Sequence, residues 1–321
     1  MRYILESIRQ RLNHRVTLLA GGVGGARMAR ALRSVLDPGQ LTVVVNVGDD
    51  TERYSVRVSP DPDTVLYTLA EVEGQHGWGR RDDTFATMDE LARFGVDTSF
   101  ALGDKDLAVC LYRTQQLENG EPLSAVTSRL ARAFGVECNL LPATDEPLET
   151  FVQIDTGSWL PFQEYFVDRR HRDDVHAVAY HGAPQALAAP GVVDAIAGAD
   201  TLVIAPSNPP LSIWPILAID PIRKAVALHQ HRVAVSPLFG GAPLKGPADK
   251  VMAGVGLSMG TRGVLEAYDG LIDVLYIDEA DSDDVGIGDA FNVAVIATDT
   301  LLTGEDRGAA FASRILDSAS R

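Results

Sequence analysis

The chain has 321 residues, of which 46% are hydrophobic and 22% are charged, a composition typical of a soluble globular protein and not of a disordered one. Its formal net charge of −16 argues against nucleic acid or an anionic membrane surface as a partner. The charge leaves a nucleotide substrate open, because local backbone donors and a metal ion can outweigh the overall field. No apolar run approaches the ~20 residues that a membrane-spanning helix needs.

Cysteine use and the N-terminal segment both favour a cytoplasmic location. Cys110 and Cys138 form no CxxC pair, so we expect neither a disulfide nor a zinc site. Residues 1–8 lack the long apolar stretch and the small-residue cleavage site of a signal peptide. Apolar residues at helical spacing predict a short amphipathic helix here, packed on the body or on a second subunit: Tyr3, Ile4, Ile8 and Leu12.

The most informative pattern begins with a predicted strand over Val16–Ala20, which runs into the glycine-rich turn Gly21–Arg27. A predicted helix (Met28–Leu36) and a second strand (Leu41–Val45) follow. A strand that opens through glycines onto a helix N-terminus leaves backbone N–H groups aimed at one point, which suits a phosphate. The turn is neither a strict GxGxxG nor a P-loop, so a structural tight turn is the alternative. Arg27 could pair with the phosphate or be a solvated surface charge.

Two acidic loops come next. Four carboxylates lie within fifteen residues: Asp49, Asp50, Asp61 and Asp63. Pro60 and Pro62 predict that the second pair lies in an extended loop, with Asp63 or Thr64 capping a helix that continues over Val65–Leu69. Capping is the bland interpretation of such residues, but four carboxylates at one edge of a sheet repel unless a cation or a proton is shared. A Mg²⁺ site or a general base is therefore favoured over capping alone.

The segment 74–190 differs from the rest of the chain in its pattern, because it mixes predicted helices with short predicted strands. The flanking segments 15–73 and 191–321 alternate strand and helix, which predicts a Rossmann-like, doubly wound, mainly parallel α/β sheet. We therefore expect a single domain of residues 1–321, in which the mixed α/β segment 74–190 is an insertion packed over the carboxyl ends of the strands, where ligands bind in such folds.

Three further loops carry polar residues at places suited to a ligand. Lys105, in a charged loop at 102–107, could anchor a phosphate or form an exposed ion pair of little energetic weight. Ser207 and Asn208 end a predicted strand over Thr201–Ala205 and suit a phosphate or a ribose hydroxyl. Gly241 and Lys245 follow the next predicted strand and repeat this arrangement.

Together these segments resemble the 2-phospho-L-lactate transferase family of coenzyme F-420 biosynthesis, called CofD or FbiA. The resemblance runs from about residue 16 to residue 279. The matching segments are Leu19–Arg27, Val45–Asp50, Ser59–Tyr67, Trp78–Gly79, Leu102–Asp106, Phe162–Val167, Pro206–Pro209 with Ser212–Ile213, and Val235–Pro237 with Gly246–Pro247. The departures are the 14-residue N-terminal extension and Pro62, where a larger apolar residue is expected.

The resemblance implies an enzyme that joins the deazaflavin alcohol Fo to a phosphorylated three-carbon acid. The donor would be a guanosine diphosphate adduct of lactate, enolpyruvate or a related acid, and GMP would leave. The ribityl 5′-hydroxyl would attack the phosphorus next to the acid, giving (dehydro) coenzyme F-420-0. A homodimer that uses Mg²⁺ is the family expectation. Which three-carbon acid is carried does not follow from any motif.

The resemblance also suggests roles for the residues singled out above. Asp49 or Asp50 would hold Mg²⁺, and Asp50 and Asp63 are the candidate catalytic residues. The deazaflavin would lie near Asp63, Thr64 and Lys105. The donor nucleotide and its phosphates would lie over the glycine turn and the later loops: Gly22, Gly24, Gly25, Arg27, Ser207, Asn208, Gly241 and Lys245.

Two alternatives belong to other classes. A non-catalytic nucleotide-sugar-binding regulator of the gluconeogenesis-factor type would carry a Gly-Gly-Ser-Ser-Gly run after its Asp-Asp pair, whereas Asp50 is followed here by Thr51–Tyr54. A dinucleotide oxidoreductase would end its second strand in a single acidic residue, whereas this chain has Asn46–Asp50. We therefore favour the transferase.

Overall fold

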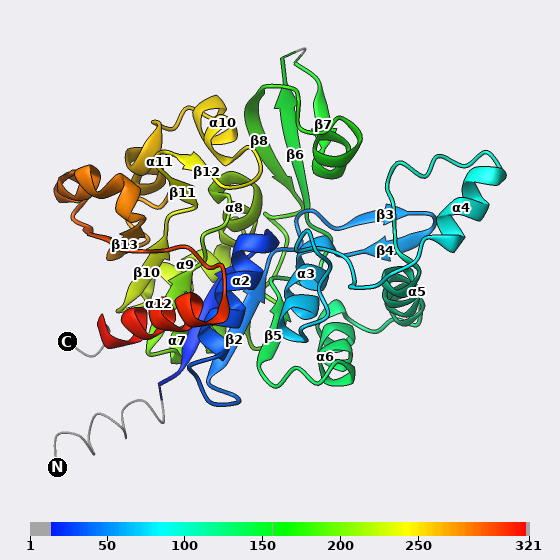
Figure 1. Cartoon of the computed structure of the whole chain (residues 1–321), viewed down its shortest axis with the longest axis horizontal. Helices are drawn as coiled ribbons and strands as arrows, with labels where there is room; N and C mark the ends of the chain where they lie inside the picture. The colour runs from blue at the N-terminus through cyan, green and yellow to red at the C-terminus, as the bar shows by residue number, and fades with distance from the viewer. Residues whose placement is uncertain (1–13, 156, 319–321) are drawn as a thin grey trace.

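The computed structural model describes residues 14–155 and 157–318, so the N-terminal helix expected over residues 3–12 lies outside the described residues. The centre of the fold is a seven-stranded sheet with the order β14-β13-β10-β9-β1-β2-β5, in which every neighbouring pair is parallel (Figure 1). Its strands are β1 (Val16–Ala20), β2 (Leu41–Val45), β5 (Asn139–Pro142), β9 (Thr201–Ile204), β10 (Arg232–Val235), β13 (Val274–Ile277) and β14 (Ala294–Ala297).

The strand order changes direction at β1. The chain first adds β2 and β5 on one side of β1, then returns to place β9 on the other side and continues outward to β14. Val16 pairs with Leu41 of β2 and with Thr201 of β9, so the three central strands are in close register. The strand order thus reverses between β1 and β9, and ligands of doubly wound sheets bind outside the carboxyl ends of the strands at such a point.

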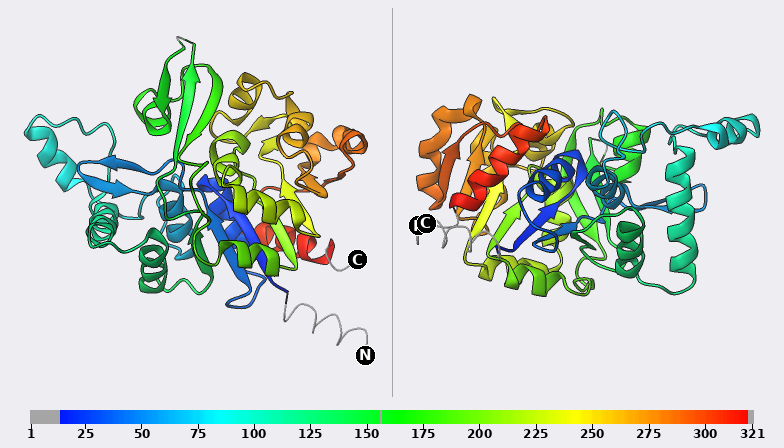
Figure 2. Two further views of the ribbon diagram at one scale, coloured as in Figure 1. Left: turned by 180° about the vertical axis from the view of Figure 1, so that it is seen from behind. Right: turned by 60° about the horizontal axis from the view of Figure 1, so that its bottom comes forward.

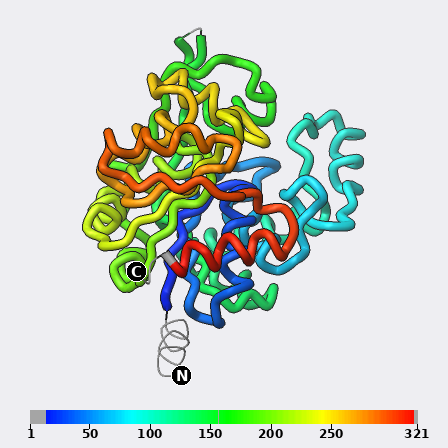
Figure 3. Tube along the Cα trace, turned by 60° about the vertical axis from the view of Figure 1, so that its left-hand side comes forward, coloured from blue at the N-terminus to red at the C-terminus, as the bar shows by residue number. Residues whose placement is uncertain are grey.

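Helices cover both faces of the sheet, which confirms the predicted doubly wound α/β fold. One face carries α2 (Gly22–Arg33), α3 (Pro60–Leu69) and α12 (Glu305–Ser318), and α2 packs between the other two (Figures 1 and 3). The opposite face carries α7 (Val192–Gly198), α9 (Asp220–Leu228) and α11 (Gly260–Ala267), seen from behind in Figure 2.

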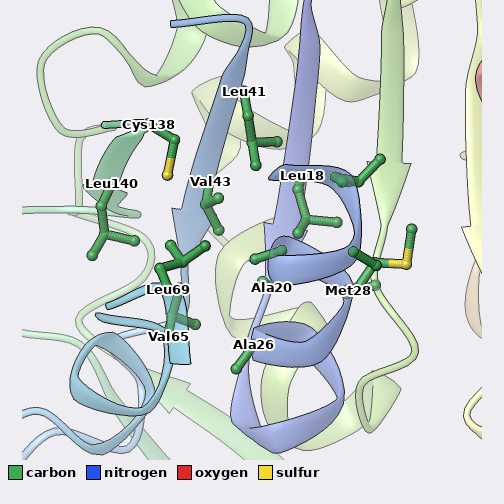
Figure 4. Packing of buried hydrophobic residues seen from close by; sticks show 14 of the residues in the cluster. Leu18, Ala20, Ala26, Met28, Leu41, Val43, Val65, Leu69, Cys138 and Leu140 are labelled. Carbon is green, nitrogen blue, oxygen red and sulfur yellow. The ribbon is translucent and has the colours of Figure 1, made fainter. Parts of the chain in front are cut away.

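Side chains alternate between the two cores because successive residues of a strand point to opposite faces. Leu18 packs in the core under α2 and α3, and its neighbour Leu19 packs in the core on the other side. In the first core, Ala26 and Met28 of α2 lie over β1, while Val65 and Leu69 of α3 lie over β2 (Figure 4). The buried strands therefore read as continuous apolar runs, as parallel strands covered on both faces do.

The remaining elements project from this body. The β3–β4 hairpin and α4 extend to one side, and the β6–β7–β8 sheet stands above the carboxyl ends of the central strands (Figure 1). These and the other elements are β3 (Thr51–Arg53), β4 (Val56–Val58), α4 (Ala86–Arg93), α5 (Asp104–Glu118), α6 (Leu123–Ala133), β6 (Glu149–Ile154), β7 (Trp159–Pro161), η1 (Glu164–Asp168), β8 (Val175–His181), η2 (Pro209–Ile213), α8 (Trp214–Leu217), β11 (Leu238–Phe239), β12 (Ala242–Pro243), α10 (Ala248–Gly254) and η3 (Glu279–Phe291). Within the described part of the chain, no helix is both long and apolar enough to cross a membrane.

Two of the differences from the expected elements concern helices α2 and α3. Helix α2 begins at Gly22 and not at Met28, so the glycines form its first turn. Helix α3 begins at Pro60, with Ser59 as its N-cap. The prediction that Asp61 and Asp63 lie in an extended loop, with Asp63 or Thr64 as the helix cap, is therefore wrong. Proline is tolerated in the first helical turn because its missing N–H has no partner there, so the two prolines start this helix and do not delay it.

The division of the chain at residues 74 and 190 stays a prediction. Part of that range belongs to the main sheet, because β5 pairs with β2 as an edge strand. The rest supplies α4, α5 and α6 beside the sheet and the β6–β7–β8 sheet above it.

Candidate active site

The first wall of the site is the close packing of the α2 N-terminus against the loop after β9. The Ser207 hydroxyl donates to the Gly21 carbonyl oxygen over 2.7 Å. A Cβ added to Gly24 would lie 2.2 Å from the Pro206 carbonyl oxygen, and one added to Gly25 would lie 2.9 Å from the Ala20 Cβ. The glycines are therefore required because two backbones approach each other here, as well as for any ligand.

Asp61 lies at the N-terminus of α2, at the position where a phosphate was expected. The Gly22 N–H donates to Asp61 Oδ1 over 2.7 Å, and the Asn46 amide donates to Asp61 Oδ2 over 3.0 Å. The same amide lies 3.3 Å from Asp49 Oδ1. Asn46, directly after β2, therefore links Asp49 to Asp61, which is twelve residues farther along the chain.

The other three carboxylates of the acidic segments lie close by, and only Asp61 contacts the α2 N-terminus directly. Asp49, Asp61 and Asp63 are buried, and Asp50 accepts a 2.7 Å hydrogen bond from the Ser59 hydroxyl through Oδ2. The other oxygen of Asp50, Oδ1, is buried and has no hydrogen-bond partner among the described residues. The Gln163 amide donates to the Asp49 carbonyl over 3.0 Å and anchors the segment from the β7–η1 side.

Burial controls the ionisation of these groups. Burial raises the pKa of Asp50 to about 8, against the hydrogen bond from Ser59 and the charge of Arg113. Burial likewise raises the pKa of Asp61 to about 6, and burial together with the neighbouring Asp61 and Asp50 charges raises the pKa of Asp49 well above its usual range. Carboxyl groups that crowd in this way hold protons or share a cation near neutral pH.

Asp63 faces away from α2 and pairs with Arg113 of α5. The Arg113 guanidinium donates through Nη2 to Asp63 Oδ1, and the two side chains are exposed by only 2% and 7%. Nearby, the Tyr67 hydroxyl donates to Asp106 over 2.6 Å. Asp63, Asp106 and Cys110 each place one polar atom within 4.8 Å of the others.

Sequence reasoning did not assign Arg113 or Asp106 to the site. A signal was present, because residues 106, 110 and 113 are spaced by four and three and so share one face of a helix. An arginine and an aspartate on the face that also carries buried Cys110 indicate a buried charge pair. The partner on α3 could not be found from this spacing.

The predicted acceptor residues occupy different places. Thr64 is buried in the first half of α3. Lys105 is in the first turn of α5 and not in a loop, and its ammonium donates to the carbonyl oxygen of Asp82 over 2.7 Å. Asp106, the next residue along the chain, approaches Asp63 in place of Lys105.

The other residues predicted to bind phosphate lie in three separate places. Arg27 lines a cavity of about 90 Å³ between α2 and the segment 73–77. Lys245 and Gly241 lie at the β11–β12 hairpin, where the Lys245 ammonium is 3.4 Å from the His76 carbonyl oxygen and 5.7 Å from the Trp78 ring centre. Asn208 accepts from the Leu211 N–H over 3.3 Å, which starts η2.

The family described as 2-phospho-L-lactate transferase CofD matches residues 16–295. The chain belongs to this CofD family. The match spans the glycine turn, the acidic segments and every strand of the sheet up to the middle of β14.

Curated relatives of this CofD-family protein extend over its whole length. A phosphoenolpyruvate transferase from Streptomyces griseus is 41% identical over 312 residues, covering 95% of this chain and 98% of the relative. A phosphoenolpyruvate transferase from Thermobifida fusca is 40% identical over 319 residues, covering 95% and 98%. The protein is thus a member of a phosphoenolpyruvate and 2-phospho-L-lactate transferase enzyme family.

A crystal structure of a UPF0052-family protein from Bacillus halodurans shares the fold. Its TM-score is 0.66 at 16% identity, and the match covers 95% of this chain and 99% of that one. At this identity the likeness bears on the fold alone.

Proposed function

We propose that this CofD-family enzyme transfers a phosphorylated three-carbon acid from its guanosine diphosphate adduct to the 5′-hydroxyl of the deazaflavin Fo, with release of GMP. The observation that carries the proposal is the buried carboxylate cluster at the α2 N-terminus, in a chain 41% identical to a phosphoenolpyruvate transferase. That name favours the phosphoenolpyruvyl group over the phospholactyl group, so the product would be dehydro coenzyme F-420-0.

The carboxylates fit a hard divalent cation such as Mg²⁺. Asp50 Oδ1 is a buried oxygen that has no hydrogen-bond partner within the described structure. Carboxylate oxygen is the ligand that Mg²⁺ prefers, and ionised Asp49 and Asp50 would hold the ion. When bound, the ion would neutralise charge on the diphosphate of the donor.

In the proposed transfer, the acceptor hydroxyl oxygen bonds to the phosphorus next to the acid while the bond from this phosphorus to the GMP phosphate oxygen breaks. GMP leaves with that oxygen and its electron pair. The hydroxyl proton passes to a carboxylate, for which Asp63 is our candidate, with Asp50 as the second catalytic group. Such transfers depend chiefly on alignment of the reacting groups and on charge stabilisation.

The donor nucleotide would lie over the carboxyl ends of β1 and β9. Without side chains, Gly22, Gly24 and Gly25 do not screen the backbone N–H groups of the α2 N-terminus from the phosphates. Arg27 and Lys245 are the candidate cationic contacts for phosphate. Asp61 occupies the Gly22 N–H, so the diphosphate would contact this turn only where the cation, or a proton on Asp61, offsets the carboxylate charge. Thr64 and Lys105 remain candidate contacts for the deazaflavin, and a homodimer remains a prediction.

The direct test is transfer by the purified protein with Fo, Mg²⁺ and, in parallel, the enolpyruvyl, lactyl and glyceryl guanosine diphosphate adducts. We expect GMP release and a phosphodiester product with one of these donors, and loss of both after chelation of the metal. Binding of Fo is followed separately by its fluorescence. Nucleotide-sugar binding without Fo binding or GMP release would instead favour the regulatory alternative.

A further inference from the structure

Arg113 is among the most completely buried large side chains of the described chain, and it forms an ion pair with Asp63. Its guanidinium donates to Asp63 Oδ1 through Nη2 and to the Arg57 carbonyl oxygen, over 3.1 Å, through Nη1. A guanidinium does not deprotonate in proteins, so its burial requires a carboxylate beside it. The second contact to a backbone carbonyl fixes the plane of the guanidinium as well as its position.

The pair makes the two oxygens of Asp63 different. Oδ1 is occupied by Arg113, whereas Oδ2 is buried and, in the described part of the chain, has no hydrogen-bond partner. A buried carboxylate oxygen without a donor is unfavourable, so Oδ2 is the oxygen that a ligand group can satisfy. We propose that Arg113 is a positioning residue, which occupies Oδ1 and so directs Oδ2 of Asp63 toward the acceptor hydroxyl. This inference rests on the function proposed above for Asp63.

A second contact between the same helices fixes the direction of Asp63. The Tyr67 hydroxyl of α3 donates to Asp106 of α5, one helical turn from Asp63 on α3 and two turns from Arg113 on α5. Residues four apart, or seven apart, lie on one face of a helix. The two contacts therefore set both the rotation of α3 about its axis and its position along α5.

The stability of the fold alone does not explain why the chain buries the Arg113–Asp63 ion pair. Replacing a buried ion pair by well-packed apolar residues is often neutral or stabilising, so a structural role does not require Arg113. Positioning does require it, because a misplacement of about 1 Å at a reacting group can lower the rate about 10²-fold. The two explanations predict different kinetics.

The experiment is a double-mutant cycle in the full chain with Arg113→Lys, Asp63→Asn and the double variant. Lysine keeps the charge but loses the planar fork, so we expect kcat to fall about 10- to 100-fold with KM for the donor changed less than about threefold. Because Arg113 acts through Asp63, the double variant should have the kcat of Asp63→Asn within about twofold. Arg113→Gln, with a donor but no charge, replaces Arg113→Lys if the latter does not fold.

The matched control is Arg232→Met, which breaks the Arg232–Asp273 pair at the amino ends of β10 and β13. It should lower Tm and leave kcat unchanged. Wild-type kcat in Arg113→Lys, or the same fractional loss of kcat in the presence and absence of Asp63, would overturn the positioning role alone. Wild-type kcat in Asp63→Asn would instead overturn the proposed role of Asp63 itself.

Discussion

The carboxyl group of Asp50 is enclosed by protein, with a hydrogen bond from Ser59 on one oxygen. Its other oxygen has no hydrogen-bond partner among residues 14–155 and 157–318. Burial raises the pKa of the Asp50 carboxyl group to about 8. A residue that the sequence marks only as acidic is thereby a protonated acid or a cation ligand near neutral pH, depending on what is bound. The environment, more than the residue type, sets this behaviour.

Asp50→Asn should therefore have opposite effects on stability and on activity. We expect Tm in metal-free buffer at pH 8 to be equal to or above that of the wild type, because a buried group that would otherwise ionise has been removed. The gain in Tm on adding Mg²⁺ should be largely lost, and kcat should fall about 10²- to 10³-fold. Differential scanning fluorimetry and GMP release measure the two effects.

The control for this variant is Asp220→Asn, which removes an exposed carboxylate paired with Lys224 on α9. It should leave the Mg²⁺ response and kcat unchanged, since exposed ion pairs contribute little. An Asp50→Asn protein with a wild-type Mg²⁺ response would remove Asp50 from the proposed cation site.

At the scale of elements, the site depends on how closely α2 meets the loop after β9. The space for a Cβ on Gly24 is already taken by the Pro206 carbonyl oxygen at 2.2 Å, a backbone atom that cannot move alone. The same helix presents its N-terminus to Asp61 of α3. Any shift of α2 therefore changes both its contact with the loop after β9 and its contact with Asp61.

Gly24→Ala tests this close approach. We expect a loss of about 1–3 kcal/mol in the free energy of unfolding, the usual range for overpacking. We expect a larger relative loss of donor binding, because α2 or the loop after β9 must move to make room for the methyl group. Gly286→Ala in η3 is the matched control, since a Cβ there meets no described atom within 4 Å. Urea unfolding and a titration with GDP measure the two quantities, and equal effects of the two substitutions would argue against the packing explanation.

At the scale of the whole molecule, several raised carboxyl pKa values act together. Burial raises the pKa to about 8 for Asp50 and to about 6 for Asp61 and Asp106, whereas an unfolded aspartate has a pKa near 3.9. Between about pH 4 and pH 8 these three carboxyl groups thus bind more protons in the folded chain than in the unfolded chain. Linkage then requires that these groups contribute less stability as pH rises.

The Tm of the metal-free protein should consequently fall as pH rises from 5.5 to 8.5, by an amount reduced in Asp50→Asn. Mg²⁺ should raise Tm more at pH 8.5 than at pH 5.5, because the cation binds the ionised carboxylates and competes with protons at low pH. A thermal-shift grid of pH against Mg²⁺ concentration measures both trends. An Mg²⁺ effect that is the same at every pH would separate the cation site from these carboxylates.

Much of this protein follows from local patterns in the sequence. Apolar runs bounded by glycine and proline predict the parallel strands, and the carboxyl ends of such strands share one edge of the sheet whatever the details of packing. That is why Asp50 and Ser207, which follow different strands, could be placed in one region from the sequence, and why the motifs sufficed to suggest the CofD family.

Only the tertiary structure decided which side chains pair. Asp61 and Asp63 are two residues apart in the first turn of α3, so they point to different sides, one to the α2 N-terminus and the other to Arg113, fifty positions along the chain. These partners depend on the rotation of each helix about its axis, which is fixed by packing between distant segments and leaves no mark in a local pattern. The sequence by itself determined where the acidic groups gather, and long-range packing decided what each carboxylate oxygen contacts.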